Sequence, residues 1–330
     1  MLNNHWYLVL EAREVPKKKP IVVTRLGEKV VFWRDQNGTV CCIYDKCCHR
    51  GASLGLGKVV DDHIECPFHG MQYDSSGKVT VIPANGKNTP VAEHYKVNSF
   101  IVREAYGFIW LWWGDQHIEV PELKFFEELK QGFAYATFSD HWNVHYTRAI
   151  ENQLDVVHVP FVHKTTIGIG HRTLVHGPGV RRTKNQLRIF VHNTTDDGHT
   201  IPLKPSEIQI DEHQGFNELQ FRFPNIWQNV ISDKVRVFAG FVPVDEENSV
   251  IYIRYYHKIT NLPIIKHFIN LIGLITSKII LAQDKRVVLT QIPKKTSLKM
   301  GENLIPGDTP IVEFRKYREE LLALNPSKPK

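Results

Sequence analysis

The sequence lacks two features of secreted proteins, a set of paired cysteines and a recognisable signal peptide. Only five of its 330 residues are cysteines, an odd number, and four of these lie between positions 41 and 48. A disulfide-stabilised secreted fold would spread paired cysteines along the chain, so this class is excluded. The first residues also lack a positive segment followed by an apolar run, which argues against a signal peptide. We therefore expect a cytoplasmic protein.

Phosphate-binding loops and strongly charged tracts are missing as well. Two glycine pairs, near residues 170 and 178, do not stand between a strand and a helix in the GxGxxG spacing, so no flavin or nicotinamide site is expected. The net charge is +6, but the longest basic run is only Lys17 to Lys19. A nucleic-acid surface would need a larger basic patch, so no nucleic-acid partner is expected.

One apolar stretch, residues 264–281, approaches the length of a membrane span. Lys266, His267, Asn270 and Lys278 interrupt it, whereas a spanning helix needs about 20 mostly apolar residues. We therefore expect a buried helix of a soluble protein here, and no membrane span.

The chain does contain two short cysteine–histidine pairs, in C-x-H and C-x2-H spacing. In a Rieske [2Fe–2S] cluster two thiolates hold one iron and two imidazoles hold the other, so each loop can supply one ligand of each kind. A glycine follows soon after each pair, at Gly51 and Gly70, where the backbone can turn tightly. The four candidate ligands are Cys47, His49, Cys66 and His69.

A structural zinc site is the alternative, since zinc also binds sets of two cysteines and two histidines. Zinc fingers, however, pair cysteine with cysteine and histidine with histidine along the chain. The alternating order in this sequence favours an iron–sulfur cluster.

Residues 44–54 and 66–73 together resemble the Rieske domain of the Rieske non-haem iron oxygenases. One position departs from the family pattern: Cys48 stands where the family usually has proline, and we interpret it as a bystander. Respiratory Rieske proteins carry an extra cysteine in each loop, and this chain has none there. The resemblance therefore implies the low-potential, intracellular type.

Hydrophobic periodicity predicts an α+β fold in two domains, with a boundary near residue 117. Residues 1–117, rich in short β-branched and aromatic runs, would form an all-β Rieske [2Fe–2S] domain. Residues 118–330 would combine an antiparallel sheet (186–191, 218–223, 235–242, 250–257) with helices at 264–288 and 312–324. This arrangement is similar to the helix-grip (START-like) catalytic domain of the family.

Residues 151–163 indicate a second metal site. Asp155 and His158 are three residues apart and would share one face of a helix. His163 would point elsewhere on an ideal helix, but a kink at Pro160 could bring both imidazoles together. Two histidines and one carboxylate are typical of iron(II) enzymes that activate dioxygen. Taken alone the pattern is weak, and a core helix is the alternative.

The resemblance assigns roles within this segment. It makes His158 and His163 ligands of a mononuclear Fe2+, and it makes Asp155 the carboxylate that carries electrons between this iron and the cluster. Asn152 matches a family position near the iron.

The third iron ligand would be Asp284, on the long helix near the end of the sequence. Asp284 could instead only pair with the basic residues beside it. Asp245 and Glu246 are less attractive ligands, because they stand in a predicted turn.

The resemblance also implies the function. The chain would be the terminal oxygenase (alpha) subunit of a multicomponent system, similar to vanillate and dicamba O-demethylases and saxitoxin-pathway hydroxylases. A separate reductase, directly or through a ferredoxin, would supply electrons from NAD(P)H. With O2 as co-substrate, the reaction would be monooxygenation of a small organic molecule, by hydroxylation or demethylation. Aromatic cis-dihydroxylation is one alternative, and an electron carrier without oxygenase activity is another.

In this family the cluster of one subunit serves the iron of the next, with His69 facing the neighbouring Asp155. Such a head-to-tail contact closes into a ring, so we expect a homotrimer. The sequence does not identify the substrate. Asn225, Trp227, Gln228 and the loop 165–172 are candidates for lining its pocket, although each could be structural.

Overall fold

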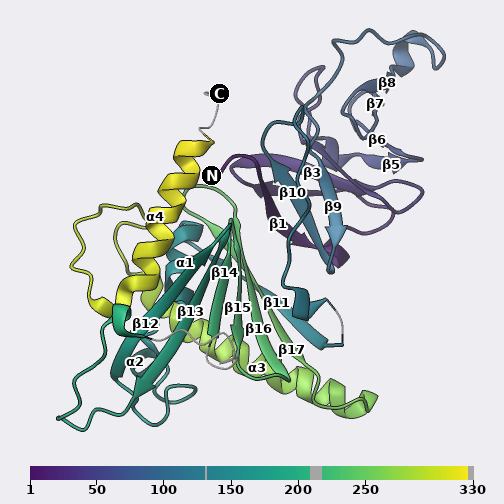
Figure 1. Cartoon of the computed structure of the whole chain (residues 1–330). Coiled ribbons are helices and arrows are strands. Elements are labelled where there is room, and N and C mark those ends of the chain that lie inside the picture. Colours follow the sequence, from purple (N-terminus) through teal and green to yellow (C-terminus); the bar gives the residue numbers. More distant parts are fainter. Residues whose placement is uncertain (131, 209–217, 326–330) are drawn as a thin grey trace. The chain divides into compact units, whose positions relative to one another are not determined.

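The computed structural model describes residues 1–130, 132–208 and 218–325, and the chain forms two compact units (Figure 1). Their division falls between Leu123 and Lys124. The boundary expected near residue 117 lies a few residues earlier, and the last five residues of the expected second domain lie outside the described ranges. Each unit is described by itself below.

The first unit is built from three small antiparallel sheets. One has the order β1-β10-β9 (His5–Glu11, Phe108–Trp113, Val102–Ala105) and a second has β2-β3-β4 (Ile21–Arg25, Glu28–Arg34, Val40–Tyr44). The third has β5-β6-β7-β8 (Lys58–Val60, His63–Glu65, Gln72–Tyr73, Val79–Val81). Trp33, Ile43, Ile64 and Tyr73 are fully buried in a core that also contains Cys47 and Cys66. The loops that carry these two cysteines are therefore anchored in the buried core of the unit.

The second unit is a seven-stranded antiparallel sheet with helices packed on it. Its strand order is β11-β17-β16-β15-β14-β13-β12 (Ala134–Trp142, Ser249–His257, Val235–Pro243, Ile226–Val230, Glu218–Arg222, Gln186–Thr194, Leu174–Thr183). The α+β class is confirmed, although β11, β12 and β15 were not predicted from the sequence.

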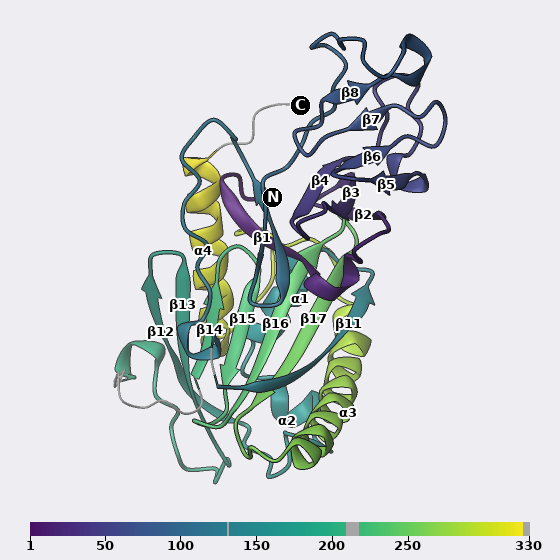
Figure 2. The ribbon, with the colours of Figure 1, turned by 90° about the vertical axis from the view of Figure 1, so that its right-hand side faces the viewer.

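Four helices complete this unit: α1 (Tyr146–Leu154), α2 (Val159–Val162), α3 (Pro263–Val288) and α4 (Thr309–Leu324). The long helix α3 packs along β11 and β17, and α4 packs on β12 and β13 (Figures 1 and 2). The short helix α1 contacts both α3 and α4. The sheet thus carries α1 and α3, and the short helix α2 packs on α3.

The predicted burial of residues 264–281 is wrong. The segment is helical as expected, but only 11% of its most apolar window is buried, and Ile264 and Ile272 are 73% and 64% exposed. Among the described residues α3 is the one helix that is long and apolar enough to cross a membrane by length and composition. Hydropathy could not predict that the helix is mostly exposed, because the helix turns its less apolar side toward the sheet.

A cluster of buried charged side chains joins helix α1 to helix α4. The Arg315 guanidinium donates to both oxygens of Glu151, at 2.8 and 2.7 Å, and Arg148 donates to Glu151 at 3.2 Å. Glu302 accepts from Arg148 at 3.1 Å and pairs with Arg315 at 2.7 Å. Because the side chains of Arg148, Glu151 and Arg315 are almost fully buried, each charge depends on its partners.

We predict that Glu151→Ala destabilises the fold by about 3–5 kcal/mol, because it leaves two buried guanidinium groups short of a carboxylate. Urea unfolding measures this loss. Glu313→Ala is the control: it removes a carboxylate of α4, the helix that carries Arg315, and that carboxylate pairs with exposed Lys316. Its cost should stay within about 0.5 kcal/mol. Equal unfolding midpoints for the two variants would contradict the role given to the cluster.

Candidate metal centres

Two loops of matching backbone geometry present the cysteine–histidine pairs. In each loop the N–H of the cysteine donates to the carbonyl oxygen five residues later, at 2.8 Å in both. The glycine four residues after the cysteine donates back to the cysteine carbonyl, at 2.9 Å for Gly51 and 3.1 Å for Gly70. Both glycines have positive φ, 76° and 71°, as their place in tight turns requires. The sequence repeat is therefore also a structural repeat.

The four side chains divide into a buried half and an exposed half. Cys47 and Cys66 are 3% and 1% exposed, whereas His49 and His69 are exposed. The two Nδ1 atoms of these histidines lie 3.2 Å apart. A cluster held here would have its thiolates in the core and its imidazoles at the surface, where an electron-transfer partner can approach. The mixed donor set fits a Rieske centre.

Tyr73 is a further residue of this loop pair. Its hydroxyl lies 3.0 Å from Cys47 Sγ and accepts the backbone N–H of Cys48 at 3.1 Å. Burial, together with hydrogen bonding to the thiols, raises the pKa of Tyr73, so the hydroxyl keeps its proton for the sulfur. The interpretation of Cys48 as a bystander is thus incomplete: the residue is exposed, but its backbone N–H donates to the Tyr73 hydroxyl and its Sγ lies 3.3 Å from the same oxygen.

The second candidate site lies where α1 ends and α2 begins, and its local structure differs from the prediction. The sequence suggested one helix kinked at Pro160, but α1 stops at Leu154 and Asp155 is extended (φ −73°, ψ 126°). Pro160 stands in the first turn of α2, a position where its missing N–H costs nothing. His158 is the residue immediately before α2, and His163 is the residue immediately after it. A break in the helix, rather than a kink, brings them together.

Asp284 from α3 completes the group. The Nε2 atoms of His158 and His163 are 3.3 Å apart. Asp284 Oδ1 lies 2.9 Å from the His163 Nε2 and 3.4 Å from the His158 Nε2. All the possible ligand atoms lie within 4.8 Å of one another. Separations of about 3 Å are those of adjacent ligands around a metal ion with bonds of about 2.1 Å.

The donor set fits a divalent metal ion. Asp284 is 2% exposed, yet its Oδ1 has no hydrogen-bond donor among the described residues, although two imidazoles surround it. Burial lowers the pKa of His158, but its contacts with Asp155 and Asp284 outweigh this and raise the pKa to about 9. Burial acts to raise the pKa of Asp284, but the two histidines hold it at about 2. A buried carboxylate facing two imidazoles is a site that attracts a cation.

Two glutamines that the sequence analysis did not identify contact His163 and Asp284. Gln283 Oε1 lies 2.8 Å from His163 Nδ1, so this ring nitrogen donates and the Nε2 lone pair faces the site. Gln153 donates to the second oxygen of Asp284 at 3.3 Å. Partners of this kind fix the ring and carboxylate orientations that a metal needs. Each glutamine is next to a predicted site residue in the sequence, but this position alone did not predict its contact with the site.

Asp155 lies beside the group without belonging to it. Asp155 Oδ2 is 3.5 Å from His158 Nδ1, and its Oδ1 accepts the N–H groups of Val157 and His158 at 2.6 and 3.3 Å. Asp155 thus both ends α1 and faces His158. Asn152, on α1, has a buried side-chain nitrogen without an acceptor among the described residues.

A cavity of about 950 Å3 opens beside this site. Asp155 and Asp284 line it, and apolar side chains form somewhat more than half of its wall. Trp227 lies in the wall as the sequence suggested, and its buried indole N–H has no acceptor among the described residues. Residues of the suggested loop, such as Ile167, also line the cavity.

Asn225 and Gln228 do not line this cavity. Both are fully buried and are engaged elsewhere: Asn225 donates to the Phe241 carbonyl, and Gln228 donates to Gln220.

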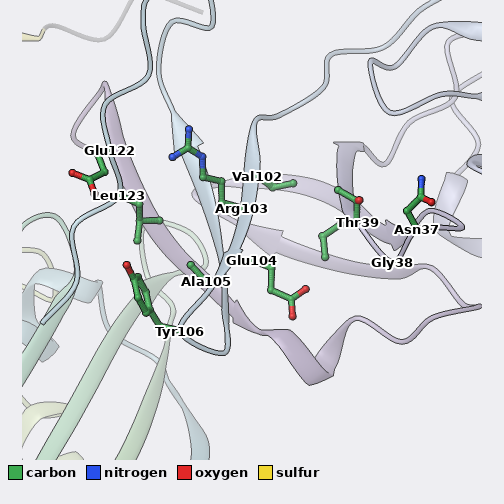
Figure 3. A pocket seen from close by; sticks show the side chains of 11 residues that line it. Asn37, Gly38, Thr39, Val102, Arg103, Glu104, Ala105, Tyr106, Glu122 and Leu123 are labelled. Atoms are coloured by element: carbon green, nitrogen blue, oxygen red, sulfur yellow. The ribbon is translucent and has the colours of Figure 1, made fainter. Parts of the chain in front are cut away.

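The first unit contains a separate hollow of about 580 Å3 between β9 and the turn after β3 (Figure 3). Arg103, Glu104 and Tyr106 are among its lining residues, none of which is a cysteine or histidine. Glu104 pairs with Arg34 at 2.5 Å. The hollow therefore has none of the cysteine and histidine ligands that define the two candidate centres above.

Comparison with known families defines the class. Residues 5–100 match the Rieske [2Fe-2S] domain, and residues 142–324 match the vanillate O-demethylase oxygenase C-terminal domain. The second match covers more than half of the chain. The chain belongs to the Rieske non-haem iron oxygenases, as an alpha-type subunit with a vanillate O-demethylase-type second domain.

Individual relatives share part of the sequence. The chain is 35% identical to chlorophyllide a oxygenase of Chlamydomonas reinhardtii over 51% of its length, and 34% identical to the vanillate O-demethylase oxygenase subunit of a Pseudomonas species over 50%. The aligned parts are 26% and 46% of those proteins, so the chain spans about half or less of their length. Dicamba monooxygenase bound to dicamba has the same fold, with a TM-score of 0.80 over 98% of both chains at 19% identity.

We predict that Gln283→Leu weakens Fe2+ binding by about 10- to 100-fold, because His163 loses the acceptor that fixes its ring. Competition with a chelator measures the affinity, and the absorption of the cluster checks that the first unit is intact. Gln283→Glu keeps an acceptor oxygen and should bind iron far better than Gln283→Leu. Thr165→Val, which removes only the 3.4 Å contact to Gln283, is the matched control. Unchanged iron affinity in Gln283→Leu would refute the orienting role.

Proposed function

We propose that this chain is a terminal oxygenase that monooxygenates a small organic molecule by hydroxylation or oxidative demethylation. Residues 1–117 would carry the Rieske cluster and residues 118–330 the catalytic iron. The cluster ligands are Cys47, His49, Cys66 and His69, and the Fe2+ ligands are His158, His163 and Asp284.

The proposal rests on one observation: Asp284 forms part of the wall of the 950 Å3 cavity. Ferrous iron at such a site supplies the binding and reduction of O2 next to a bound substrate. The volume lies at the upper end of the usual range for small-molecule pockets, about 300–1,000 Å3. A pure electron carrier would need neither the cavity nor the group of His158, His163 and Asp284, so the structure favours an oxygenase over that alternative.

The chain's own residues would then have distinct tasks. Gln283 keeps the His163 Nδ1 proton in place, and Gln153 holds the outer oxygen of Asp284. The apolar wall excludes water and orients an apolar substrate. The indole N–H of Trp227, which has no acceptor in the described part of the chain, can donate to a carbonyl or ether oxygen of that substrate.

Electrons would come from outside the chain, through a separate reductase and, in some systems of this type, a ferredoxin. We propose that they pass from the cluster of one subunit to the iron of the next in a homotrimer, with His69 facing the neighbouring Asp155. Two features support this route: His69 is exposed, and the Asp155 side chain is 26% exposed while facing His158. A reducing compartment such as the cytoplasm suits the unpaired cysteines.

Isotope labelling tests the proposal. The holoprotein is reduced, mixed with a library of candidate substrates and 18O2, and the products are analysed by mass spectrometry. Monooxygenation predicts one labelled oxygen per turnover in the hydroxylated product or in the aldehyde released by demethylation. Asp284→Ala should give no product although its cluster is reduced normally. Two labelled oxygens in one product would support cis-dihydroxylation instead, and cluster oxidation without product from any compound would support an electron carrier.

A further inference from the structure

The outer face of α3 carries a continuous apolar stripe. Its members are separated by four, three, one, three and four residues, the spacing of a single helix face. Each is between 46% and 73% exposed. The α3 stripe consists of Ile264, Phe268, Leu271, Ile272, Ile275 and Ile279. With a rise of about 1.5 Å per residue, it runs for about 22 Å.

The stripe cannot turn inward, because the opposite side of α3 is committed to the sheet and the metal site. A Cβ at Gly273 would lie 2.3 Å from the Tyr255 ring, so the helix approaches β17 as closely as glycine allows. Ser277, Leu281 and Asp284 on the same side face the cavity. An ordinary surface helix has the reverse arrangement, with apolar residues inside and polar residues outside. The stripe therefore needs a partner outside this chain's core.

Along the sequence, the charged residues next to the stripe are all basic. From Ser249 to Gln283 the sequence contains no aspartate or glutamate, but it contains Lys258, Lys266 and Lys278. Lys278 is exposed at the edge of the stripe, and the exposed His267 lies on the same edge. A second copy of this face would bring like charges together, which disfavours self-association. An apolar stripe with a cationic edge complements a surface that is apolar within and anionic at its rim.

We propose that the α3 stripe binds the surface of a bilayer that contains anionic lipids, with the helix axis parallel to the membrane plane. Helices of this kind bury their apolar face about 5–10 Å deep, while lysines contact the headgroups. Spanning would detach α3 from Tyr255 and remove Asp284 from His163. The inner side of the same helix lines the cavity, so docking brings that wall within about one helix diameter of the lipid.

Vesicle flotation of the detergent-free holoprotein tests this proposal. The probes are vesicles of phosphatidylcholine alone and of phosphatidylcholine with about a quarter phosphatidylglycerol. The wild type should float with the anionic vesicles and dissociate at high salt. The double substitution Ile272→Gln with Ile275→Gln should weaken this binding at least about tenfold. Lys278→Gln should weaken it about fivefold.

The matched control replaces two other exposed apolar residues of the same unit, Ile201→Gln with Leu324→Gln, which are 85% and 74% exposed. It should bind like the wild type, and the cluster absorption should be unchanged in every variant. Analytical ultracentrifugation measures the assembly in parallel. Wild-type protein that stays off anionic vesicles, or an Ile272→Gln, Ile275→Gln protein that still binds them, overturns the proposal. A smaller assembly in that variant, without vesicle binding by the wild type, identifies the stripe as a subunit contact instead.

Discussion

The second unit depends on one constraint: a buried carboxylate oxygen must meet two imidazole nitrogens that come from a different part of the chain. Asp284 Oδ1 is buried, has no hydrogen-bond donor among the described residues, and lies 2.9 and 3.4 Å from the two Nε2 atoms. Without a cation such an oxygen costs stability, so the surrounding structure must hold it there. The break after α1 supplies the histidines, and the long helix α3 supplies the carboxylate.

Several features follow from holding this geometry. The buried ion pairs of Glu151 fasten α1 to α4, and Gln283 and Gln153 orient the ligands at closer range. Because α3 must present Asp284 and Gly273 to the sheet side, its isoleucines are left on the outside. The exposed apolar stripe is therefore linked to the metal site through the orientation of one helix. The same orientation gives α3 a cavity wall on one side and a candidate lipid-binding face on the other.

From the sequence, the chemistry of the two sites could be predicted better than their local structure. Ligand order alone separated the cluster loops from a zinc finger, and the glycines at 51 and 70 do adopt the tight turns that their position predicts. Asp284 was found only through family resemblance, since nothing near it in sequence marks a ligand. The break at Asp155 was missed because its cause is a side-chain contact with the backbone two residues on. The exposure of α3 was missed because hydropathy records composition and not which side of a helix meets the sheet.

The most direct test of this account is the iron and acid-labile sulfide content per chain. For the wild type the account predicts about three irons and two sulfides, two irons in the cluster and one at the triad. Asp284→Ala should retain about two irons and both sulfides, with the absorption spectrum of the cluster unchanged. About three irons in folded Asp284→Ala protein, bound as tightly as in the wild type, would contradict the central claim that His158, His163 and Asp284 together hold the mononuclear iron.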